Sequence, residues 1–178
     1  MGRAPAKRSG EFALIERYFR PLAADRGAFG LTDDAALYRQ RPGDDLVLTA
    51  DVVAAGIHFL PDDPPESIAR KALRVNLSDL AAKGATPDFY LLNLTLPHGL
   101  TEEWLAGFAA GLRQDQAHYG FSLLGGDTSA TEGPLAIAVT AFGFVPQGGM
   151  VKRGGARPDN ALYVTGSIGD SAGGLALF

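Results

Sequence analysis

The chain has 178 residues, which is enough for one hydrophobic core, or for one domain and part of another. Hydrophobic residues make up 46% and charged residues 20%, and the formal net charge of -4 argues against broad electrostatic binding to nucleic acid. The absence of cysteine excludes a disulfide framework, a thiolate zinc site and a cysteine nucleophile, and it fits a cytoplasmic location.

The predicted elements alternate between helix and strand. Residues 1–10 carry basic side chains without an apolar stretch behind them, so we expect a disordered tail rather than a signal peptide. No run of about 18 apolar residues predicts a membrane span. Helical periodicity follows in residues 10–23, interrupted by Pro21. The next elements are a strand at 45–53, a helix at 64–84, a strand at 88–97, a helix at 101–120 with Thr101 as N-cap and Gly120 at its end, and strands at 121–127 and 133–146.

The last thirty residues differ from the rest. Residues 147–160 are polar and glycine-rich, and residues 161–178 predict a strand, a glycine-rich turn and the start of a helix. We therefore expect a first domain of residues 11–148 and, in residues 149–178, the start of a second domain that is truncated. One strand and part of a helix cannot form a core of their own.

Four acidic positions lie beside apolar elements instead of in charged surface runs. The adjacent carboxylates of Asp33 and Asp34 repel each other unless a positive group neutralises them. In the strand at 45–53, Val47, Thr49, Asp51 and Val53 share one face, so a hydroxyl and a carboxylate are directed to one point.

The other two acidic positions follow the same pattern. Asp79 continues a helical stripe with Ala72, Val75 and Ala82, where a carboxylate needs a partner. Asp127 follows two glycines, whose missing side chains would let a ligand approach the backbone. Carboxylates and a hydroxyl without a histidine cluster favour Mg²⁺ over zinc.

Each of these signals also has an ordinary structural explanation. An Asp-Asp pair is often a solvated turn, and Asp79 can pair with Arg74 or Lys83. His58 can be a structural histidine, and Arg153 a solvated charge in a linker.

Taken in order, the motifs resemble the thiamine-monophosphate kinase family, within the aminoimidazole-ribonucleotide-synthetase-like superfamily. The matching stretches are "GEFALIERYF", "TDDAALY", "LTADVVAAGIHFLPDDPPESIARKALRVNLSDLAAKGATP", "LLGGDTS" and "ARPDNALYVTGSIGDSAGGLAL". This resemblance implies an α/β (α+β) domain with a mixed sheet and helices packed on one face. It also implies ATP-dependent phosphorylation of thiamine monophosphate to thiamine diphosphate with several Mg²⁺ ions, and a homodimer built through the strands of the N-terminal domains.

The resemblance also implies roles for individual residues. His58 would contact thiamine monophosphate, and ATP would contact Gly126, Asp127 and Arg153. The metal ligands would be Asp34, Thr49, Ala50, Asp51, Asp79 and Asp127, with Ala50 serving through its main-chain oxygen because the family usually has Thr there.

This sequence departs from the family pattern in several places. Thr32 stands where Gly is usual, the "DTSATEGPL" loop is two residues longer and lacks an Arg, and the family's later acidic motif is absent. Two alternatives therefore stay open. One is another ATP-using synthetase of the same superfamily, and the other is a non-catalytic, truncated module that dimerises and binds nucleotide.

Overall fold

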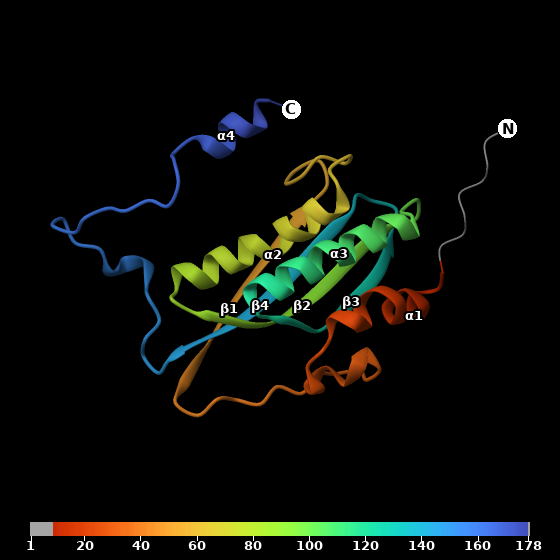
Figure 1. The fold of residues 1–178 in the computed structure, drawn as a ribbon, viewed down its shortest axis with the longest axis horizontal. Helices are drawn as coiled ribbons and strands as arrows, with labels where there is room; N and C mark the ends of the chain where they lie inside the picture. Colours follow the sequence, from red (N-terminus) through yellow and green to blue (C-terminus); the bar gives the residue numbers. More distant parts are fainter. Residues whose placement is uncertain (1–8, 178) are drawn as a thin grey trace.

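A four-stranded mixed sheet is the central element of the fold (Figure 1). This computed structural model describes residues 9–177 of the chain. Most of the tail expected at residues 1–10 lies outside the described residues. The strands lie in the order β1-β4-β2-β3; β2 and β3 are parallel and the other neighbours are antiparallel. Their bounds are Asp44–Ala54 (β1), Thr86–Pro97 (β2), Ser122–Thr131 (β3) and Ala136–Pro146 (β4).

Two long helices, α2 (Pro65–Ala82) and α3 (Glu102–Tyr119), cover one face of this sheet (Figure 1). Thr101 caps α3 by accepting a hydrogen bond from the backbone N–H of Trp104 at 3.2 Å, and Gly120 ends it in the left-handed conformation. The core lies between these helices and the sheet. Buried in it are Ile68 and Leu73 of α2 and the even-numbered leucines of β2. The mixed sheet with helices on one face confirms the expected fold class.

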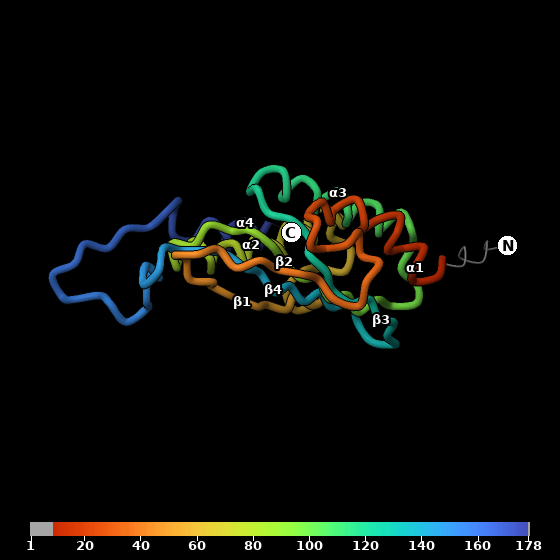
Figure 2. The backbone as a smooth tube through the Cα atoms, turned by 90° about the horizontal axis from the view of Figure 1, so that it is seen from below, coloured from red at the N-terminus to blue at the C-terminus, as the bar shows by residue number. Residues whose placement is uncertain are grey.

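The N-terminal segment packs around the β3 edge of the sheet (Figures 1 and 2). It contains α1 (Glu11–Leu14), a π-helical turn η1 (Ile15–Phe19), and the 3₁₀ turns η2 (Arg20–Leu22) and η3 (Arg26–Leu31). The following chain continues over the second face, where Ala28, Tyr38 and Phe89 pack near Leu124. This segment covers β2 and β3, but the outer face of β1 stays open.

The two faces of the sheet follow from its register. Asp51 pairs with Val139, which pairs with Leu92, and these positions face the helices. Val52 and Asn93 both pair with Ala138, on the opposite face. The predicted alternation along β1 is therefore confirmed, with Val47 and Val53 buried and Leu46, Leu48 and Val52 exposed.

Strand β4 is not an edge of the sheet. It lies second in the sheet and is hydrogen-bonded on both sides, to β1 and to β2. The edges are β1 and β3, and the exposed apolar side chains lie on β1.

The chain after β4 leaves the sheet at the end remote from α1 (Figures 1 and 2). The Val151 N–H donates to the carbonyl of Lys83 at 3.1 Å, and beyond it come η4 (Arg153–Gly155) and α4 (Asp170–Leu175). The strand expected near residues 161–165 does not form, because the residues there are exposed and have no neighbouring strand. No helix in the described chain is long and apolar enough to cross a membrane.

Candidate functional site

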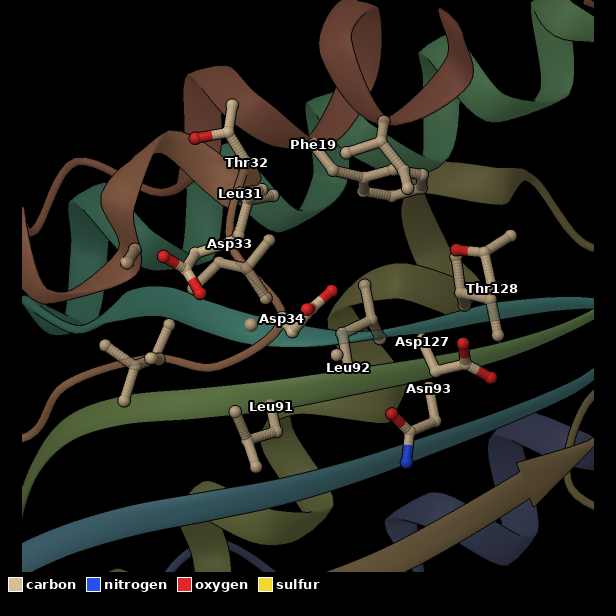
Figure 3. Close-up of a pocket in the computed structure, with 18 of the residues that line it drawn as sticks. Phe19, Leu31, Thr32, Asp33, Asp34, Leu91, Leu92, Asn93, Asp127 and Thr128 are labelled. Carbon is tan, nitrogen blue, oxygen red and sulfur yellow. The ribbon is translucent and has the colours of Figure 1, made fainter. Parts of the chain in front are cut away.

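A cavity of about 800 Å³ lies at the β3 edge of the sheet. One wall comes from α1 and η1, and the opposite wall comes from the middle of β2 and β3. Asp33 and Asp34 lie in the bend after η3, and Figure 3 shows them on one side of the cavity, with Asp127 and Asn93 on the strands across from them. The structure therefore brings together two of the predicted acidic positions, the Asp33–Asp34 pair and Asp127.

Gly126 lies directly before Asp127 and is required by the sheet itself. Its φ is 154°, and a Cβ atom there would lie 1.8 Å from the carbonyl oxygen of Leu92. The missing side chain at Gly126 leaves room for the backbone of β2. This close approach sets Asp127 beside Asn93, its register partner on β2.

A second acidic group lies at the other edge of the sheet. Thr49 donates its hydroxyl hydrogen to Asp79 Oδ2 at 2.9 Å, joining β1 to the C-terminal part of α2. Asp51 lies on the same face of β1 as Thr49, and Ala50 lies on the opposite face. Asp79 is exposed and not buried in an apolar stripe, and Arg74 pairs with Asp115 instead of with Asp79.

The acidic residues at the β3 edge and those at the β1 edge do not form one site within a single chain. Three strand spacings, about 14 Å, separate β1 from β3. The register also places Asp51 on the helix side of the sheet and Asp127 on the opposite side. Within residues 9–177, no three His, Cys, Asp or Glu side chains lie close enough together to hold a metal ion. The donor types, carboxylates and one hydroxyl, nevertheless suit a hard cation such as Mg²⁺.

His58 lies in the loop that follows β1, on the same edge as Asp51. Its Nδ1 accepts a hydrogen bond from the Ala54 N–H at 3.1 Å, and its carbonyl accepts one from Lys71 Nζ. With Nδ1 accepting, the neutral ring carries its proton on Nε2. The exposed imidazole is therefore fixed by its backbone neighbour and presents an N–H donor.

Arg153 is exposed and is not among the residues that line the cavity. It follows by two residues Val151, whose N–H donates to the carbonyl of Lys83 directly after α2. The structure thus does not bring Arg153 to Gly126 and Asp127 within one chain.

Two polar residues on the strand wall of the cavity were not singled out from the sequence. Asn93 and Thr128 both line it beside Asp127. Asn93 interrupts the apolar strand "DFYLLNLTLP", and a polar residue at mid-strand was the available signal. The sequence gives no comparable signal for Thr128. The strand was expected to end at residue 127, whereas β3 continues to Thr131.

The part of the chain that forms this mixed sheet matches a known class of domain. Residues 32–145 match the family described as AIR synthase related protein, N-terminal domain, and the chain belongs to this family. Within it, the chain is 48% identical over 166 residues to the thiamine-monophosphate kinase of Caulobacter vibrioides, covering 93% of this chain and 47% of that protein.

Solved structures lead to the same relatives. The thiamine-monophosphate kinase of Stenotrophomonas maltophilia K279a superimposes with a TM-score of 0.81 at 41% identity, over 94% of this chain and 52% of that one. AaThiL complexed with AMPPCP and TMP gives a TM-score of 0.73 at 33% identity, over 94% and 52% of the two chains. The resemblance seen in the motifs is confirmed, and the chain spans about half the length of these relatives.

Proposed function

We propose that this chain is the N-terminal, metal- and nucleotide-binding part of an enzyme that phosphorylates thiamine monophosphate to thiamine diphosphate with ATP. The observation that carries the proposal is the similarity to AaThiL complexed with AMPPCP and TMP, together with the carboxylates that line the cavity. In this proposal residues 11–148 are the first domain, and residues 149–178 begin the second. The absence of cysteine is compatible with a cytoplasmic enzyme.

The carboxylates explain why the reaction needs a cation. Like charges a few ångströms apart repel by roughly 1 to 4 kcal/mol per pair at surface-like dielectric constants, so Asp34 and Asp127 alone would reject a polyphosphate. Bound Mg²⁺ would neutralise the charge that develops on the transferred phosphoryl group. The residues that would hold several such ions are Asp34, Thr49, Asp51, Asp79 and Asp127, with the main-chain oxygen of Ala50.

The remaining roles fall to residues that bind and orient the two substrates. The apolar wall of the cavity, which includes Ile15, Phe19 and Leu31, suits the base and sugar of ATP, and Gly126 and Arg153 would contact the nucleotide. His58 would donate its Nε2–H to thiamine monophosphate. Because the acceptor phosphate is already anionic and nucleophilic, alignment of the two phosphates is the main requirement.

The separation of the two acidic groups favours a homodimer. Asp51 and Asp79 lie at the β1 edge, and Asp34 and Asp127 lie at the β3 edge, so one chain supplies two half-sites. In a two-fold dimer, the β1 edge of one chain can meet the β3 edge of its partner and complete two equal sites. The exposed Leu46, Leu48 and Val52 on β1 supply the apolar surface for this contact.

The proposal is tested by measuring thiamine diphosphate formation from thiamine monophosphate, ATP and Mg²⁺. The assay uses the protein at its natural length and the purified 178-residue chain side by side. We expect turnover from the first and far slower transfer from the second. A natural-length protein that makes no thiamine diphosphate contradicts the proposed activity.

A further inference from the structure

The carboxylate of Glu102 joins the start of α3 to the N-terminal segment. Its Oε1 accepts hydrogen bonds from the backbone N–H of Ser9 at 3.1 Å and from the Ser9 hydroxyl. Its Oε2 accepts from Arg17 Nη1 at 2.6 Å and from the Tyr18 hydroxyl at 3.1 Å. One side chain thus holds three residues that precede it by more than 80 positions.

The segment held in this way forms a wall of the cavity. Ile15, Glu16 and Phe19 line the cavity from η1, while Arg17 and Tyr18 of the same turn reach Glu102. The turn is π-helical, a geometry that is rare and concentrated at functional sites. Leu14 and Phe19 anchor this wall in the core, whereas Phe12, nearer the N-terminus, is 85% exposed.

We propose that Glu102 is a positioning residue, which fixes the α1–η1 wall against the strands and so sets the affinity of the cavity for the nucleotide without touching it. This inference rests on the proposed function, in which the cavity binds ATP. Glu102 itself is not among the residues that line the cavity.

The chemistry of the contact requires a carboxylate at this position. Both oxygens accept, one from Ser9 and the other from Arg17 and Tyr18. Gln has one acceptor oxygen, and its amide nitrogen can only donate, so at these two positions it cannot accept from both the Ser9 N–H and Arg17. The hydrogen bonds from Ser9 lower the pKa of Glu102, and Glu102 lies in the first turn of α3, where a negative charge is favourable.

The test compares Glu102→Gln with Glu103→Gln in the natural-length protein. Glu103 is the next residue of the same helical turn and is exposed, and within residues 9–177 its side chain makes no hydrogen bond. Its variant therefore removes the same charge without removing such contacts. Amide hydrogen exchange of residues 11–19 reports the wall, and the KM values for ATP and thiamine monophosphate report the cavity.

For Glu102→Gln we expect the amide exchange rates of residues 11–19 and the KM for ATP each to rise about five- to tenfold. The kcat and the KM for thiamine monophosphate should stay unchanged. Glu103→Gln should match the wild type in all four measurements. Unchanged exchange in Glu102→Gln overturns the inference, and so does faster exchange with an unchanged KM for ATP. A wild-type protein without phosphoryl transfer instead contradicts the proposed function.

Discussion

Among single residues, Gly126 occupies a position that other residues cannot fill, because the Leu92 carbonyl oxygen lies where a Cβ atom would be. Gly126→Ala should lower the free energy of unfolding by at least about 2 kcal/mol, since β3 must move away from β2. Gly125→Ala is the matched control, with its nearest atom 3.5 Å from the added Cβ, and should cost less than about 1 kcal/mol. Urea unfolding measures both, and equal losses would contradict the steric argument.

The acidic residues at the β1 edge give a prediction about metal binding. Asp51→Asn and Asp79→Asn should each weaken Mg²⁺-ATP binding about tenfold or more while leaving the fold nearly intact, because they remove charge from the proposed ligand group. Asp62→Asn, in an exposed loop, is the control and should bind as the wild type does. Calorimetry with the natural-length protein makes the comparison. Wild-type affinity in both edge variants would rule out the proposed ligands.

Asp88 gives a prediction about pH. Its carboxylate is 17% exposed and lies 2.6 Å from Arg41, and burial raises the pKa of Asp88 although Arg41 opposes the shift. A folded pKa above the unfolded value means that the folded state favours the protonated form. As the pH falls from 7 through the folded pKa, the wild type should therefore gain stability relative to Asp88→Asn.

Urea unfolding of both proteins at pH 7 and at about pH 4.5 measures this difference. Global effects of acid act on both proteins and cancel in the comparison. A wild type that loses stability relative to Asp88→Asn on acidification would show that attraction to Arg41 outweighs burial.

At the scale of elements, the contact between α2 and α3 includes one buried charge. Asp115 is 2% exposed and accepts two hydrogen bonds from Arg74, each 2.8 Å long. Asp115→Ala should lower the free energy of unfolding by about 2–3 kcal/mol, because both bonds to a charged group are lost. Gln114→Ala, exposed on the same helix, should change it by less than about 0.5 kcal/mol. Thermal unfolding that shows equal losses would mean that the pair adds no stability.

For the whole molecule, the two separated acidic edges predict complementation between subunits. Mixed dimers of Asp51→Asn and Asp127→Asn chains would contain one site with both substitutions and one intact site. Random mixing of the two inactive proteins should therefore restore about a quarter of wild-type turnover, since half of the dimers are mixed and each has one working site. No recovery after verified subunit exchange would place the whole site within one chain.

The sequence alone determined α2, α3, the four strands of the sheet and the alternation along β1, because these depend on local periodicity and capping. The helix expected over residues 10–23 is divided into α1, η1 and η2, and the strand expected near residues 161–165 does not form. Thr101 and Gly120 mark the ends of α3 as expected, and Thr49 and Asp51 share a face because alternate residues of any strand do. The family could be assigned from motifs of the same local kind.

The tertiary structure decided how these elements meet. Whether β4 is central, how closely Gly126 approaches the Leu92 carbonyl, and whether Asp51 and Asp127 share a point all depend on strand order and on pairings between distant residues. The contact of Glu102 with Ser9 and Arg17 is likewise nonlocal. Such contacts follow from packing the whole chain into one core, which a local pattern of residues does not specify.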